Sequence, residues 1–235
     1  MAQPATVDEV LSRLRAIDAA LPPSDGVAVF NRMYLTVTER IAALLAGDDH
    51  GLAPFRDGPR MVELDVRFAN LWLAAYEDDA AGRRPAPAWR PLFEGRRGGR
   101  LPIQYALAGM NAHIEHDLPL AVVQTCTARS LHPDDLHEDY ERVNDVLAAV
   151  ESGIRRSFLD AVGQAVDDQV GAVVHVVSAW NLDKARDLSW VTAQTLWELR
   201  RVGFLRDRFL DALGHSVGMT SRVLLTPAPH LRPLL

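Results

Sequence analysis

The sequence predicts an all-α protein, a single domain built as an orthogonal or antiparallel bundle of about seven to nine helices. Two observations carry this prediction. Apolar residues recur at i+3 and i+4 spacing in successive segments of the 235-residue chain, which is the period of an amphipathic helix. No strand alternation, internal repeat or coiled-coil heptad interrupts this pattern. We therefore expect residues 1–235 to form one helical domain.

The N-terminal part of the chain is expected to form three amphipathic helices, over residues 6–21, 27–45 and 60–78. Tyr34 lies within the apolar stripe of the second helix, and Asp65 lies within that of the third. Both polar side chains are therefore predicted to face the core, where each needs a partner.

Residues 79–102 are rich in glycine, proline and arginine and are predicted to form a long surface loop. Trp89, Leu92 and Phe93 could pin this loop to the body of the domain. Long loops in compact domains often act as lids or binding loops. The alternative is a loosely ordered connector.

The helix predicted over residues 102–117 carries the most informative polar pair. His113 and Asp117 are four apart and continue its apolar stripe, so both are expected to be buried on one face. His116 lies about 300° round the helix from His113 and is expected to point elsewhere. Because Pro119 lacks an N–H, the helix should kink or restart near residues 117–118.

Further helices are expected over residues 120–127, 133–158, 169–180, 182–202 and 204–213. Tyr140 lies on the apolar stripe of the second of these segments. Arg186 and Trp190 share a face of the segment 182–202. Residues 225–235 contain three prolines and should form an extended tail.

Composition excludes several classes of protein. Hydrophobic residues make up 48% and charged residues 24% of the chain, and the net charge is -6, which argues against a nucleic-acid binder or a polybasic membrane anchor. The single cysteine, Cys126, excludes an intrachain disulfide and a cysteine-based zinc site. The chain shows neither a signal-peptide pattern nor an apolar run of roughly 20 residues. We expect a cytoplasmic protein.

The inward-facing polar residues form the candidate site. Its leading members are Asp65, His113, Asp117 and Arg186, and its secondary members are Asn111, Tyr34, Tyr140, Asp139 and Asn144. Trp190, with Trp72 and Trp197, could wall an aromatic pocket beside them. No nucleophile elbow, phosphate-binding loop or dinucleotide fingerprint is present.

Three interpretations of this set remain open. In the first, His113, Asp117 and Asp65 bind zinc, iron or manganese, which would activate water or polarise a carbonyl group. In the second, no metal is involved: Asp117 orients His113 for acid/base chemistry, and Arg186 binds an anionic or carbonyl oxygen of a substrate. In the third, the charges form a buried network that only fixes helix register.

Several blocks of sequence resemble the actinobacterial domain-of-unknown-function family numbered 5995, in residues 25–41, 64–73, 104–122, 137–151 and 184–190. The block from Gly109 through Asn111, His113 and Asp117 to Pro119 is the most specific. The resemblance implies a helical fold and supplies no activity. It implies functional positions at Asp65, Asn111, His113, Asp117, Asp139, Asn144 and Arg186.

A looser likeness links the central helix to the helices of zinc-dependent phospholipase C and P1-type nucleases. Those helices carry a further histidine where this sequence has Ala121. The missing ligand weakens any carry-over of a zinc site to this chain.

The sequence favours a small-molecule enzyme, of the kind found in secondary metabolism, with an internal polar pocket for acid/base or metal-assisted chemistry. The expected catalytic residues are His113, Asp117 and Asp65. The expected substrate-binding residues are Arg186, Asn111, Tyr34, Tyr140, Asn144 and Trp190. The alternative is a non-catalytic helical protein that binds a small ligand. The expected partner is a small molecule, neither a nucleic acid nor a membrane, and a homodimer is an open possibility.

Overall fold

Four of the described helices begin at a side chain that caps them. The computed structural model describes residues 2–48, 52–144, 146–147 and 180–227. The oxygens of Thr6, Asp25, Asp57 and Asn181 accept hydrogen bonds from the first-turn N–H groups of their helices, which would otherwise lack partners. The elements that follow are α1 (Val7–Ala20), α2 (Gly26–Leu45), α3 (Gly58–Ala80), α4 (Arg90–Gly95), α5 (Pro102–Ala112), the π-helical turn η1 (His113–Asp117), α6 (Leu118–Arg129), α9 (Leu182–Leu199) and α10 (Gly203–Leu224).

The predicted all-α bundle is confirmed: the described part of the chain is helical and contains no strand. Residues 134–144 and 146–147 are also helical. The rest of the predicted segment 133–158, the segment 169–180 up to residue 179, and the tail from residue 228 lie outside the described residues. No helix in the described ranges is long and apolar enough to cross a membrane.

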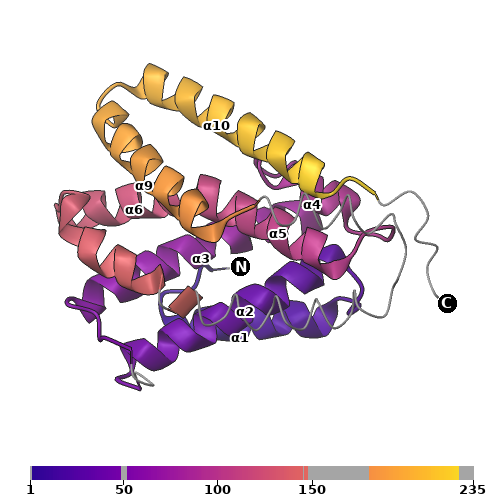
Figure 1. Cartoon of the computed structure of the whole chain (residues 1–235), viewed down its shortest axis with the longest axis horizontal. Coiled ribbons are helices and arrows are strands. Elements are labelled where there is room, and N and C mark those ends of the chain that lie inside the picture. The colour runs from indigo at the N-terminus through magenta and orange to yellow at the C-terminus, as the bar shows by residue number, and fades with distance from the viewer. Residues whose placement is uncertain (1, 49–51, 145, 148–179, 228–235) are drawn as a thin grey trace.

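Helix α5 lies at the centre of the bundle. It packs against α2 on one side and α10 on another, and Figure 1 shows α10 running along one edge of the molecule. All its residues except Pro102 and Met110 are buried, which is typical of a helix that is apolar all round. Gly109 permits the close approach to α2, because a Cβ atom there would lie 2.2 Å from the Phe30 ring.

Two apolar clusters make up most of the core. One joins α1, α2, α4 and α5, with Trp72 of α3 and Trp89 fully buried within it. The other joins α6, α9 and the helical residues 134–144 and 146–147, and includes Met61 and Leu64 of α3. Phe68 and Met110 contact both clusters. The candidate site lies where the two clusters meet.

The prediction of a surface loop over residues 79–102 is wrong for its middle part. Residues 81–84 and 97–99 are exposed, but α4 lies between them, and Trp89, Leu92 and Phe93 are core residues. The pinning role expected of these three side chains is therefore confirmed. Glycine and proline mark turns but do not reveal how apolar residues between them pack.

The last helix is longer than predicted. It was expected to end at residue 213, but α10 continues to Leu224 because Val217, Ser221 and Leu224 extend its buried face. Gly218 lets this helix approach the loop before α4, since a Cβ atom there would lie 2.6 Å from the Pro87 carbonyl oxygen. The predicted helix 120–127 likewise extends over all of α6.

Candidate functional site

The π turn η1 joins α5 to α6 without breaking the helical path. The N–H of Leu118 donates to the carbonyl of His113, five residues back, and Pro119 occupies the first turn of α6, where no N–H is needed. The expected kink at Pro119 is therefore a widened turn. Such single π turns occur frequently at functional sites.

The π turn brings two histidines to one carboxylate. Asp117 Oδ2 lies 3.1 Å from His113 Nδ1, and Asp117 Oδ1 lies 2.7 Å from His116 Nδ1. The indole N–H of Trp89 donates to Oδ2 at 3.0 Å. His116 does not line the cavity beside His113, but it directly precedes Asp117 and reaches the other oxygen of that carboxylate, a contact that the sequence analysis did not predict.

Asp117 is the anchor of this cluster. Burial alone would raise its pKa, but the hydrogen bonds and positive potential of His113 and His116 outweigh burial, and the net pKa lies below the usual value. A carboxylate that stays ionised needs donors from its partners. Each histidine therefore places its Nδ1 proton toward Asp117.

His113 consequently has an unprotonated Nε2. Burial lowers the pKa of His113 more than Asp117 raises it, so the ring is neutral near pH 7. With the proton on Nδ1, Nε2 keeps a lone pair, and it has no hydrogen-bond partner among the described residues. The ring is stacked on Phe68, with centroids 3.6 Å apart, and lies edge-on to Tyr34.

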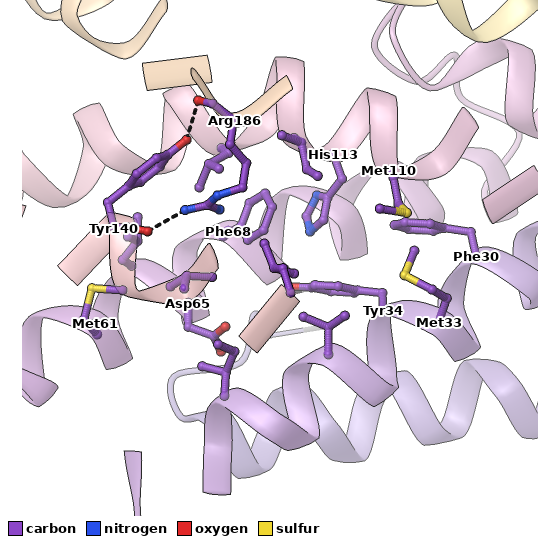
Figure 2. Close-up of a pocket in the computed structure, with 17 residues that line it drawn as sticks. Phe30, Met33, Tyr34, Met61, Asp65, Phe68, Met110, His113, Tyr140 and Arg186 are labelled. Carbon is purple, nitrogen blue, oxygen red and sulfur yellow. Dashed lines mark hydrogen bonds between the residues drawn. The ribbon is translucent and has the colours of Figure 1, made fainter. Parts of the chain in front are cut away.

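His113 lies in the wall of a cavity of about 90 Å³. Figure 2 shows its ring directed toward Tyr34 and Phe68, with Arg186 and Tyr140 across the cavity. The remaining lining is almost wholly apolar and comprises Phe30, Met33, Val37, Ile41, Met61, Leu64, Met110, Ile114, Leu118, Val143 and Leu147. Asp117 is not part of the wall and acts on the cavity through His113.

Two more polar atoms in the wall have no hydrogen-bond partner in the part of the chain that the structure describes. Burial raises the pKa of Asp65 to about 7, and its buried Oδ2 accepts no hydrogen bond. The Tyr34 hydroxyl is also buried without a partner, and burial together with the Asp65 carboxylate raises its pKa well above the usual value. Unpaired buried polar atoms are uncommon, so their convergence on one cavity indicates a site for a ligand or for water.

Arg186 completes the polar wall from α9. Its Nε donates to the side-chain oxygen of Asn144, and its Nη2 donates to the carbonyl of Tyr140 at 2.5 Å. The Tyr140 hydroxyl donates to the Arg186 carbonyl at 2.8 Å. The four leading residues of the sequence-based site thus divide into a wall of Asp65, His113 and Arg186 and a supporting carboxylate, Asp117.

Other predicted site residues have structural contacts instead. Asn111 donates to Val217 and Ser221 and so ties α5 to α10. Asp139 accepts from the backbone N–H groups of Arg56 and Asp57 and holds the start of α3 in place. Trp190 packs against His137 and Tyr140 and does not line the cavity. Asn144 holds Arg186 in place, because its side-chain oxygen accepts a hydrogen bond from Arg186 Nε.

The predicted metal ligands are not gathered round one point. Within the described ranges, no group of three or more histidine, cysteine, aspartate or glutamate side chains is arranged to hold a metal ion. Asp117 already accepts three hydrogen bonds, and Asp65 is not among its contacts. The donor set fits a histidine–carboxylate pair better than a metal centre.

Sequence reasoning missed Trp89, His116 and Phe68 as parts of the site. Trp89 lies in the segment predicted to be a surface loop. The only feature of the sequence that pointed to its burial is its large apolar side chain. Phe68 lies one turn after Asp65 on the same helix, and its stacking on His113 depends on tertiary packing that the sequence does not show.

Comparisons with known proteins leave the activity open. The model of a family of unknown function, DUF5995, matches residues 7–227. No curated protein and no solved structure matches the chain.

Proposed function

The chain belongs to the family of unknown function DUF5995, and we propose from the chemistry of its cavity that it is a small-molecule enzyme in which His113 acts as a general base. One observation carries the proposal: in the described residues His113 Nε2 is buried and unpaired, in a ring that lines the cavity, while Nδ1 is held by Asp117. A base of this kind needs a free lone pair and a fixed tautomer.

The chain's own residues support a proton-transfer cycle. His113 Nε2 would accept a proton from a substrate C–H or O–H bond, and the ionised Asp117 would stabilise the resulting imidazolium. Asp65, with its pKa of about 7, can hold a proton at neutral pH and return it to the substrate. The apolar wall excludes water and strengthens these electrostatic interactions.

A non-catalytic ligand-binding protein is the second candidate. It is favoured by the enclosure of the His113 ring, which is stacked on Phe68 and edge-on to Tyr34. Such packing limits ring movement during proton transfer. A purely structural network explains Asp117 well, but it leaves the unpaired atoms of Tyr34, Asp65 and His113 without a purpose.

Substitution of His113 tests the enzymatic proposal. We expect the wild-type protein to exchange acidic C–H protons of one or more small carbonyl compounds for deuterium in D₂O, followed by loss of ¹H NMR signal. His113→Gln should slow this exchange by about 10²–10⁴-fold, the usual contribution of a general base. The control is His215→Gln, at an exposed position on α10.

The outcomes separate the candidates. Full exchange in His113→Gln would contradict the proposal. Ligand-induced stabilisation of the wild-type protein, with no exchange or product for any compound, would support the non-catalytic alternative.

A further inference from the structure

Arg186 is a buried cation in the wall of a cavity whose lining is mostly apolar. Its residue is 4% exposed, and its guanidinium is held over the Tyr140 ring, with Cζ 4.1 Å from the ring centroid. Figure 2 shows the guanidinium projecting into the cavity between Tyr140 and Phe68. A guanidinium carries five N–H donors, and only those on Nε and Nη2 have acceptors in the described part of the chain.

The charge of Arg186 has no ion-pair partner among the described residues. Glu141, Asp183 and Asp187 raise its pKa from a distance, but burial lowers the pKa more. Asn144 links Arg186 to Glu141: its side-chain oxygen accepts from Arg186 Nε, and its side-chain nitrogen donates to Glu141 Oε2 at 2.9 Å. No carboxylate oxygen reaches the guanidinium itself.

A second inward-facing arginine, Arg96, has a structural role and provides a comparison, because it is paired with carboxylates. Arg96 contacts Asp25 at 2.8 Å and Asp79 at 2.9 Å, although its side chain is 18% exposed and hence better solvated than Arg186. A charge taken out of water is costly unless it is paired and hydrogen-bonded. Arg186 bears this cost beside a cavity, and no carboxylate of the described residues pairs with it, which favours a counter-ion bound in that cavity.

We propose that the ligand of this cavity is a small monocarboxylate with an apolar body, whose carboxylate pairs with Arg186 and whose carbon chain contacts the methionine-rich wall. The inference rests on the proposed function only in taking the same cavity as the substrate site. A planar carboxylate matches the fork of a guanidinium. One cation in an apolar wall suits a singly charged anion better than a phosphate.

The cavity limits the size of the ligand. A cavity of about 150 Å³ holds benzene, and the volume here is about 90 Å³. The carboxylate should therefore have roughly four to six non-hydrogen atoms, on the order of acetate to butyrate. Asp65 can accommodate such an anion by carrying a proton, since its pKa is about 7.

Methionine methyl groups provide a direct test. Met33, Met61 and Met110 line the cavity, whereas Met219 is 69% exposed on α10 and serves as an internal control. Protein carrying ¹³C-methyl methionine would be titrated with butyrate and with butyramide, its neutral isostere. We expect butyrate to shift the three cavity signals and not that of Met219, and to bind at least about tenfold more tightly than butyramide.

Variants assign the preference to Arg186. Arg186→Gln should abolish the advantage of butyrate over butyramide, while Arg200→Gln, at a surface arginine that stacks on Trp197, should retain it. Equal binding of the two probes by the wild-type protein would overturn the proposal. So would the absence of cavity shifts with acetate, propionate, butyrate and isobutyrate at millimolar concentrations. If Arg186→Gln does not fold, the comparison of probes on the wild-type protein decides.

The same titration separates this inference from the proposed function. His113→Gln should still bind butyrate, because the carboxylate contacts Arg186. Carboxylate binding combined with catalysis that does not depend on His113 would contradict the general base and leave the ligand class standing. Catalysis that requires His113, combined with tighter binding of the neutral probe, would support the general base and contradict the carboxylate ligand.

Discussion

Replacement of Asp117 by alanine is expected to lower the free energy of unfolding by about 3–5 kcal/mol, the usual cost of removing one partner from a buried, charged hydrogen-bonded cluster. The carboxylate accepts from Trp89, His113 and His116, which come from the segment before α4 and from the π turn. Without it, three buried donors lose their acceptor at once. Urea unfolding at pH 7 measures the change.

A surface carboxylate provides the control for Asp117. Glu39 pairs with Arg15 at 2.7 Å, but both side chains are about half exposed. Glu39→Ala should therefore change stability by no more than about 1 kcal/mol. If Asp117→Ala cost as little as Glu39→Ala, the hydrogen-bonded cluster would not be the anchor of the site.

Replacement of Asp65 by asparagine should make the protein more stable at pH 8, by about 2–4 kcal/mol. Burial raises the pKa of Asp65 from 3.8 to about 7 in the folded protein. Between these two values the folded state binds more protons than the unfolded state. The stability of the wild-type protein must therefore fall as the pH rises from about 4 to about 7, and the contribution is constant above that range.

The difference between variant and wild type isolates this contribution. The stability gain of Asp65→Asn should be near zero at pH 4, grow through neutral pH and level off near pH 8. Asp18→Asn, at a surface carboxylate paired with Arg32, is the matched control and should show no such growth. A variant no more stable than the wild type at pH 8 would show that Asp65 is solvated or paired in solution. Replacing a buried polar group is expected to stabilise the protein where that group serves ligand binding and not folding.

Periodicity in the sequence identified which polar residues face inward. Tyr34, Asp65, His113 and Arg186 each lie on an apolar stripe, and all four line the cavity. The i, i+4 spacing also predicted the contact between His113 and Asp117. The inward-facing positions of Tyr34, Asp65 and Arg186 follow from α-helix geometry, and the His113–Asp117 pair still meets within the π turn.

Periodicity could not identify what each inward residue contacts. Asn111 and Asp139 are buried as expected, but they satisfy backbone and side-chain groups of neighbouring segments. The contacts that Trp89 and His116 make with Asp117 depend on tertiary packing and side-chain orientation, which the spacing of apolar residues does not give. Pro119 signalled an irregular turn, but its form follows from the need to continue into α6.

The charge state of the His113 ring tests the central claim most directly. Protein labelled with ¹⁵N at histidine ring nitrogens would be compared with His113→Gln to assign the signals of this residue. At pH 7 we predict a neutral ring with a protonated Nδ1 and an unprotonated Nε2, because Asp117 holds the Nδ1 proton and burial lowers the pKa. A doubly protonated ring, or a proton on Nε2 alone, would leave no lone pair facing the cavity and would contradict the proposal of a general base.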